Sequence, residues 1–299
     1  MDRGFVDTHI HGAYGFDTSD GDALGIRKMA KALYAAGTTA FCPTTMTISR
    51  DEIMRSFEAV NEAMQSEEPD SAKILGVHLE GPILNPKKCG VQDSRNAILP
   101  KDAYDLIDEI ETKFPGLLKI IDISPELEGG IDFIKEFSKR YVISLAHTAA
   151  DYEICDKAFK AGATSVTHVL NATEPMLKRA TGILGAAIDN DAFIEVIADG
   201  HHIHGSYLKL LYSDVLENRL ITVSDSMRGA FMPDGTYDLG GIDVEVRGGR
   251  TYYGPNGDLA GSVTCLKAEY EVLRELGISE ERIKKTMYDN PLKRLGIMR

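Results

Sequence analysis

Residues 141–169 read YVISLAHTAADYEICDKAFKAGATSVTHV and predict a complete strand–helix–strand unit. Its two apolar runs, at 141–146 and 164–169, are short and nearly continuous, as strands buried on both faces are. The amphipathic stretch at 151–161 predicts the helix between them, with an aspartate at its start and a glycine after its end. His147 directly follows the first apolar run, and His168 is the next-to-last residue of the second. This unit indicates an α/β protein with parallel strands.

The same alternation runs along most of the chain. Apolar runs predict eight strands, at residues 5–10, 38–43, 73–79, 118–123, 141–146, 164–169, 193–198 and 220–224. Amphipathic segments predict helices, at residues 22–36, 50–66, 101–112, 130–140, 151–161, 205–217 and 263–275. Eight strands alternating with helices predict a (β/α)8 TIM barrel that occupies residues 1–299 as a single domain.

An open, doubly wound sheet is the alternative fold. It would normally have fewer strands and a glycine-rich phosphate loop, yet no G-x-G-x-x-G motif follows the first strand. The glycine-rich stretch 226–262 breaks the alternation, and its short alternating runs predict hairpins inserted in the eighth βα loop.

The composition restricts the partners. Asp and Glu number 46 against 33 Lys and Arg, a net charge of −13, which argues against nucleic acid as a partner. The sequence has no apolar stretch of membrane-spanning length, and the pattern of its first residues does not predict a signal peptide. Its four cysteines are widely spaced and predict reduced thiols. We therefore expect a cytoplasmic protein that does not contact a membrane.

All eight histidines lie at or just past the end of an apolar run. The carboxyl ends of barrel strands open onto one face, so these side chains are expected to converge in one pocket. His9 and His11 are two residues apart, which puts both on the same side of a strand, where they can share a metal ion. An H-x-H pair alone is a weak indication of a metal site. Its position at the end of the first predicted strand is what favours that interpretation.

Glu80, His147 and His168 lie at the ends of strands 3, 5 and 6 of the predicted barrel. One carboxylate and two imidazoles form a common catalytic zinc shell with a position left open for water, and iron or manganese would also accept it. Asp225 ends strand 8, where a carboxylate could take a proton from water. Asp199 ends strand 7 and is either a turn residue before a glycine or a substrate contact.

The motifs that carry this chemistry resemble the N-acetylglucosamine-6-phosphate deacetylases of the amidohydrolase superfamily. The matching segments are GFVDTHIHG, AGTTAFCPTTMT, HLEGPILNPKKCGVQ, SLAHT, THVLNA, GILGAAIDN, ADGHHIH, TVSDSMRGAFMPDGTYDLGG and DLAGSVT. The resemblance runs almost from end to end. It also implies that the family's usual small β-sandwich domain is missing, because the strand-1 motif begins at Gly4 and the sequence stops soon after Asn290-Pro291.

The resemblance assigns roles to individual residues. It implies Glu80, His147 and His168 as metal ligands, His9 and His11 as a pair for a second ion, and Asp225 as the catalytic acid and base. It implies one or two divalent ions, zinc or iron, with manganese or cobalt as alternatives. His202 is expected to contact the substrate near the scissile amide. The other positions expected to line the substrate site are Val91, Gln92, Asn171, Ala172, Asp199, Gly200, His201, Leu259, Ala260 and Gly261.

Arg179 matches an arginine that reaches the sugar phosphate from the neighbouring subunit of a homodimer. The implied reaction is hydrolysis of the acetamide of N-acetylglucosamine 6-phosphate by activated water. Two alternatives stay open. One is another amidohydrolase activity, such as deacetylation of the galactosamine epimer or hydrolysis of a cyclic amide. The other is a barrel that binds sugar phosphate without turnover.

Overall fold

The computed structural model describes residues 4–66 and 68–298. The predicted domain also includes residues 1–3, 67 and 299, and the expectation about a signal peptide concerns the first of these. Those parts of the predictions lie outside the described residues.

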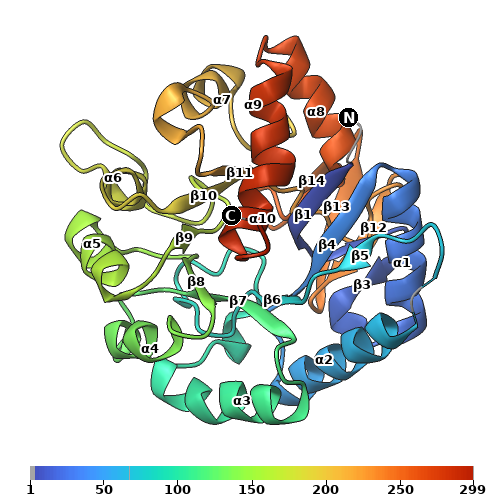
Figure 1. Ribbon diagram of the computed structural model, residues 1–299, viewed down its shortest axis with the longest axis horizontal. Coiled ribbons are helices and arrows are strands. Elements are labelled where there is room, and N and C mark those ends of the chain that lie inside the picture. The colour runs from blue at the N-terminus through green and yellow to red at the C-terminus, as the bar shows by residue number, and fades with distance from the viewer. Residues whose placement is uncertain (1–3, 67, 299) are drawn as a thin grey trace.

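Eight parallel strands form a nearly closed barrel (Figure 1). Their order is β1 (Phe5–Ile10), β4 (Thr38–Thr45), β6 (Val77–Leu79), β7 (Leu118–Ile123), β8 (Val142–Leu145), β9 (Ser165–Val166), β10 (Phe193–Val196) and β11 (Leu220–Thr222), and β5 (Lys73–Ile74) adds to β4. Beyond β11 the chain returns to β1, where the Asp225 N–H donates to the His9 carbonyl at 3.0 Å and the His11 N–H donates to the Ser226 carbonyl at 2.9 Å. The TIM-barrel prediction is confirmed, and the open sheet is wrong.

Helices surround the strands (Figure 1). They are α1 (Ala23–Ala35), α2 (Arg50–Gln65), α3 (Pro100–Lys113), α4 (Gly130–Phe137), α5 (Tyr152–Ala161), α6 (Gly182–Asp189), α7 (Gly205–Leu211), α8 (Leu266–Glu275), α9 (Glu280–Lys284), a π-helix (Lys285–Asp289) and α10 (Asn290–Arg294). Short 3-10 turns occupy Thr18–Asp20, Ser94–Asn96 and Asp214–Leu216. The Asp151 carboxylate caps α5 by accepting the Ile154 N–H at 2.9 Å, so this helix begins where the sequence predicts.

The chain forms two small antiparallel sheets outside the barrel. One pairs β2 (Gly12–Ala13) with β3 (Phe16–Asp17), directly after β1. The other contains β12 (Gly235–Leu239), β13 (Ile242–Arg247) and β14 (Arg250–Tyr252), within the stretch where the sequence predicts hairpins. Leu239, Val244 and Val246 of this second sheet are buried in the main hydrophobic core, which fixes the sheet against the barrel.

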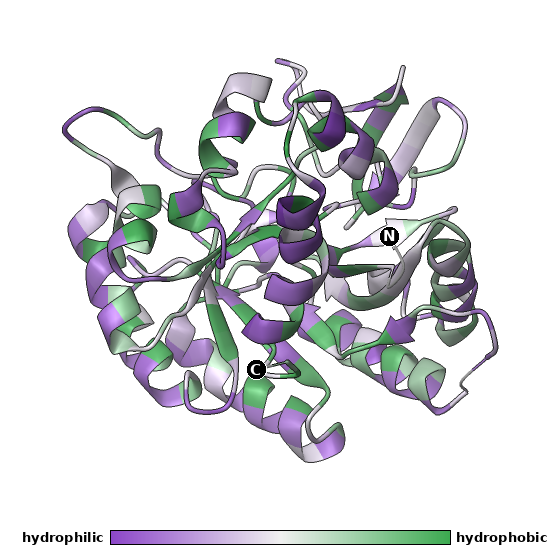
Figure 2. Cartoon of the chain, turned by 45° about the horizontal axis from the view of Figure 1, so that its top comes forward, coloured by the Kyte–Doolittle hydropathy of each residue, from purple (hydrophilic) through white to green (hydrophobic). Residues whose placement is uncertain are grey.

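Apolar side chains fill the space between strands and helices, and the outer helix faces are hydrophilic (Figure 2). The barrel interior is different, because it contains fully buried polar groups, among them Asp7, His9, His78, Asp122 and Glu195. All four cysteines are free thiols. No helix within residues 4–66 and 68–298 has the length and apolar character that crossing a membrane requires.

Candidate metal centre and active site

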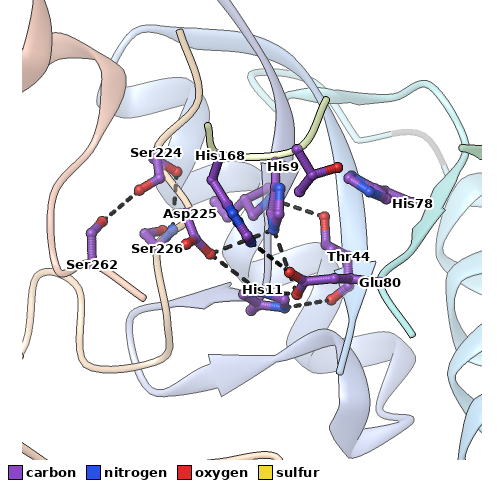
Figure 3. Close-up of polar contacts among 12 residues, drawn as sticks. His9, His11, Thr44, His78, Glu80, His168, Ser224, Asp225, Ser226 and Ser262 are labelled. Atoms are coloured by element: carbon purple, nitrogen blue, oxygen red, sulfur yellow. Dashed lines mark hydrogen bonds and ion pairs between the residues drawn. The ribbon is translucent and has the colours of Figure 1, made fainter. Parts of the chain in front are cut away.

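Glu80 lies at the centre of a cluster at the carboxyl ends of the strands (Figure 3). Its Oε1 lies 3.0 Å from Nε2 of His147 and 2.9 Å from Nε2 of His168. Its Oε2 lies 3.1 Å from Nε2 of His11 and 3.7 Å from Nε2 of His9. The structure therefore brings together all five residues predicted as metal ligands, and each oxygen of the carboxylate faces one pair of histidines.

Asp225 faces the second of these histidine pairs. Its Oδ1 lies 3.2 Å from Nε2 of His11 and 3.5 Å from Nε2 of His9. Ligands at about 2.1 Å from a tetrahedral zinc ion are roughly 3.4 Å apart. The contacts of the two imidazoles with Asp225 and Glu80 span 3.1–3.7 Å, and Nε2 of His9 is buried without a hydrogen-bond partner. Donor type, spacing and the unpartnered nitrogen all fit a divalent cation.

The two buried carboxylates attract positive charge to the cluster. Burial by itself would lower the pKa of His11, but hydrogen bonds to Asp225 and Glu80 outweigh burial and raise it to about 10. Burial would likewise raise the pKa of Glu80, yet the surrounding imidazoles hold it well below its usual range. Positive charge from protons or from a metal ion is what keeps these carboxylates ionised away from water.

Three residues of the cluster, His147, His168 and Asp225, have a left-handed backbone. The φ angles are 45° at His147, 26° at His168 and 48° at Asp225. Such values are uncommon for residues with a Cβ atom, and they cluster at functional sites because the surrounding structure must hold them. The turn at each residue ends the strand and directs its side chain into the shared cluster. The predicted strand 164–169 consequently ends early, at Val166.

The second ring nitrogen of most of the histidines around Glu80 is also held. Nδ1 of His11 donates to the Thr44 carbonyl at 3.2 Å, and Nδ1 of His147 donates to the Lys88 carbonyl at 2.8 Å. A proton fixed on Nδ1 leaves the lone pair of Nε2 directed at the cluster, as a metal ligand requires. Nδ1 of His168 is the exception, because it is buried without a partner.

Sequence reasoning missed two charged residues beneath the cluster. Nδ1 of His9 donates to Glu195 Oε2 at 3.0 Å, and Glu195 Oε1 accepts a hydrogen bond of 2.6 Å from Arg294. A signal was present, because Glu195 is an acidic residue inside the apolar run FIEV of a strand predicted to be buried on both faces. Gln92 also has a supporting contact, since its amide donates to Glu80 Oε2 at 2.6 Å.

A cavity of about 470 Å³ opens above the cluster. Besides the cluster residues His11, Glu80, His147, His168 and Asp225, most of the positions predicted to line a substrate site surround it: Val91, Gln92, Asn171, Ala172, His202, Leu259, Ala260 and Gly261. Lys87 and Lys88 line it as well, and the sequence did not single them out. Leu239 and Tyr253, from the β12–β14 region, complete one wall, so the glycine-rich insertion helps to form the cavity.

Four predicted residues lie away from this lining. Asp199 accepts hydrogen bonds from the backbone N–H groups of His201 and His202, and from Nδ1 of His202 at 2.8 Å. It therefore orients His202, while His201 and its neighbour Gly200 stay in the turn. Arg179 is exposed on the loop before α6. Its contact with the substrate of a neighbouring subunit stays a prediction.

The remaining two histidines, His78 and His204, make hydrogen bonds within the fold and lie outside the cavity. His78 is fully buried, with Nδ1 donating to the Thr8 carbonyl at 3.0 Å and Nε2 lying 2.9 Å from Asp122 Oδ1. His204 caps the start of α7. Neither of these two residues lines the cavity.

In this TIM barrel, histidines, a glutamate and an aspartate converge at the carboxyl ends of the strands. That combination is typical of metal-dependent hydrolases. The chain belongs to the amidohydrolase family, whose model matches residues 4–230. Membership of this family implies a divalent metal, and the described residues include groups that could bind one.

The chain is similar to individual deacetylases over nearly its whole length. The N-acetylglucosamine-6-phosphate deacetylase of Bacillus subtilis (strain 168) is 36% identical, and the match covers 98% of this chain and 75% of that protein. The N-acetylgalactosamine-6-phosphate deacetylase of Escherichia coli O157:H7 is 30% identical over 98% of this chain and 77% of its own length. The crystal structure of the Thermotoga maritima N-acetylglucosamine-6-phosphate deacetylase is 31% identical, with a TM-score of 0.88, covering 99% of this chain and 78% of that one.

Proposed function

We propose that this protein hydrolyses the acetamide of N-acetylglucosamine 6-phosphate to acetate and glucosamine 6-phosphate. The observation that carries the proposal is the convergence of Glu80 and four histidines beside Asp225, at the floor of a cavity large enough for a sugar phosphate. The similarity to deacetylases over nearly the whole chain supports this choice of substrate.

One divalent ion would be held by Glu80, His147 and His168, and a second by His9 and His11 together with the two carboxylates. Zinc and iron suit this mixed set of imidazole and carboxylate donors. Such an ion supplies a Lewis acid that acidifies water and polarises a carbonyl oxygen.

Asp225 moves the proton in this mechanism. Its carboxylate lines the cavity, so it can accept a proton from the attacking water as the oxygen bonds to the acetyl carbon. The same proton then passes to the amide nitrogen as the carbon–nitrogen bond breaks, which releases acetate and the free amine. Burial would raise the pKa of Asp225, but His9 and His11 lower it, so the carboxylate starts ionised as a base must.

His202 is placed to act on the acetyl oxygen. Its Nδ1 is held by Asp199 at 2.8 Å, and its ring lines the cavity. Burial lowers the pKa of His202, but the hydrogen bond to Asp199 outweighs burial and raises it. The raised pKa favours the charged ring, in which Nε2 also carries a proton and can donate to the developing oxyanion.

The phosphate needs positive groups that an acidic protein must supply locally. Lys87 and Lys88 line the cavity, and the Lys88 ammonium lies 2.7 Å from the exposed Glu174 carboxylate. We assign these lysines to the phosphate, with Arg179 of a neighbouring subunit as the further contact that a homodimer would provide. A cytoplasmic location and a homodimer complete the proposal.

Two alternatives follow from particular observations. The similarity to the E. coli galactosamine-type deacetylase favours testing the galacto epimer as a substrate. A barrel that binds sugar phosphate without turnover is the second alternative, and the complete cluster of catalytic groups argues against it.

The test is acetate release from N-acetylglucosamine 6-phosphate and from N-acetylgalactosamine 6-phosphate, measured side by side. The proposal predicts the higher kcat/KM for the gluco epimer. Asp225→Asn should lower kcat by about 10²- to 10⁴-fold while the ion at Glu80, His147 and His168 stays bound. Asp238→Asn, the same change on an exposed residue of β12, is the matched control and should leave the rate unchanged. Full turnover by a metal-loaded Asp225→Asn protein would rule out this mechanism.

A further inference from the structure

A buried polar chain links the last helix of the barrel to the metal cluster. Arg294, in α10, donates to Glu195 Oε1 at 2.6 Å and to Ser165 Oγ at 3.1 Å, and it also contacts the hydroxyl of Thr8. Glu195 Oε2 accepts the Nδ1–H of His9 at 3.0 Å. The side chains of Arg294, Glu195 and His9 are all completely buried.

This chain of contacts runs through the barrel from the end at which the parallel strands begin. The Asn290 amide of α10 donates to the Leu220 carbonyl at 2.8 Å, which fixes the helix at the beginning of β11. In Figure 1, α10 lies over the middle of the ring of strands. The cavity lies at the opposite end, where the strands finish. The Arg294 side chain therefore enters the barrel at the amino-terminal ends of the strands. It influences His9 only through Glu195, which contacts both residues.

We propose that Glu195, held in place by Arg294, is a positioning residue that sets the affinity of the second metal position by fixing the tautomer of His9. The inference rests on the proposed function, because it assumes that His9 and His11 bind an ion. The Glu195 carboxylate can only accept, so the proton of His9 stays on Nδ1 and the lone pair of Nε2 faces Asp225 and Glu80. A carboxylate partner also makes the ligand nitrogen more basic.

The rings of the other ligand histidines do not contact a buried charge through Nδ1, and Glu195 reaches His168 only at its backbone N–H, over 3.4 Å. His11 and His147 donate Nδ1–H to backbone carbonyls, whose positions are set by the barrel itself. Nδ1 of His168 has no partner. His9 is thus the ligand whose orientation relies on a side chain, and that carboxylate stays ionised in the dry interior because Arg294 neutralises it. Loss of this support should affect the second ion and spare the first.

The sharpest test is Glu195→Gln, which conserves size. The single amide oxygen of the glutamine would turn to the Arg294 guanidinium, since a charged donor makes the stronger hydrogen bond. Its NH₂ group would then face His9 and donate to Nδ1. That reversal moves the imidazole proton to Nε2, the atom that must coordinate the ion. We expect the affinity for the second ion to fall by about 10- to 100-fold.

The readout is metal bound per chain, by elemental analysis after equilibration with buffered Zn²⁺, together with the absorption spectrum of the Co²⁺-loaded protein. The unsubstituted protein should bind two ions and Glu195→Gln one, with loss of the spectral component of the second site. Lys285→Met is the matched control, since it removes an ion pair with Glu217 just before α10 without entering the barrel. It should retain both ions.

A double variant, Glu195→Leu with Arg294→Met, covers the case in which the glutamine variant does not fold. It replaces both buried charges by apolar groups, which proteins often tolerate, and it too should bind one ion. Two ions of unchanged affinity in either variant would overturn the proposal, and so would a single ion in the unsubstituted protein. Acetate release from the same samples separates this inference from the proposed function, because a two-ion protein that releases no acetate contradicts only the latter.

Discussion

Glu269 makes the stability of the barrel depend on pH. This α8 side chain is fully buried; its Oε2 accepts the Ala198 N–H at 3.1 Å, and its Oε1 has no partner. Burial, with the nearby Asp199 carboxylate, raises the pKa of Glu269 well above 4.5. The folded protein therefore keeps a proton that the unfolded chain loses. The stabilising contribution is fully present below the unfolded pKa of about 4.5, declines as the pH rises above it, and is gone once the pH has risen through the folded pKa.

The magnitude follows from this linkage. While the folded side chain keeps its proton, the free energy of unfolding falls by about 1.2 kcal/mol between pH 5 and pH 6, for an unfolded pKa near 4.5. Glu269→Gln conserves the shape of the neutral acid and cannot ionise, so the variant should lack this decline. Its stability relative to the unsubstituted protein should rise by the same amount over that pH unit.

The assay is urea unfolding of the metal-loaded proteins at several pH values, with the difference between variant and unsubstituted protein taken at each pH so that other titrating groups cancel. Glu275→Gln, on the exposed side of the same helix, controls for the loss of a carboxylate. Parallel stability curves for Glu269→Gln and the unsubstituted protein between pH 5 and pH 6 would show that Glu269 does not hold its proton in the folded state.

Two further predictions concern the substrate and the local backbone. Lys87→Met combined with Lys88→Met should raise KM for the phosphorylated sugar by about tenfold or more with little change in kcat, because a charged hydrogen bond is worth about 1.5–3 kcal/mol. Initial-rate kinetics measure both constants. An unchanged KM would show that these lysines do not bind the phosphate. Gly81→Ala should destabilise the fold and displace Glu80, because φ is 80° at Gly81 and an added Cβ would lie 2.0 Å from Oγ1 of Thr47. Thermal unfolding measures the loss of stability, and metal content measures the displacement of Glu80. A variant of full stability and full metal content would contradict this prediction.

Most of the barrel could be predicted from the sequence because strands buried on both faces are apolar runs. The predicted strand at 118–123 coincides with β7, and the Asp151 cap marks the start of α5. The sequence did not predict α6, whose segment GILGAAID carries two glycines with low helix propensity. The last helices, from Glu280 to Arg294, were missed as well, since they are short and interrupted by a π-helix.

The cluster around Glu80 was predictable because its residues stand at strand ends, and strand ends meet in a parallel barrel. The period of two in His9-x-His11 also places both imidazoles on one side, as the structure shows. The residues beneath the cluster were not predictable in this way. Glu195 and Arg294 are 99 positions apart, and only the closed fold brings them together. A buried glutamate in an apolar strand indicates that a partner exists, but it does not identify that partner.

Acetate release from N-acetylglucosamine 6-phosphate, measured for the metal-loaded protein and for the same protein after chelation, shows whether this barrel is a metal-dependent deacetylase. We expect equimolar acetate and glucosamine 6-phosphate from the loaded protein, loss of turnover after chelation, and its return when Zn²⁺ or Fe²⁺ is added. Absence of acetate from a fully loaded protein, or undiminished release from a metal-free one, would show that it is not.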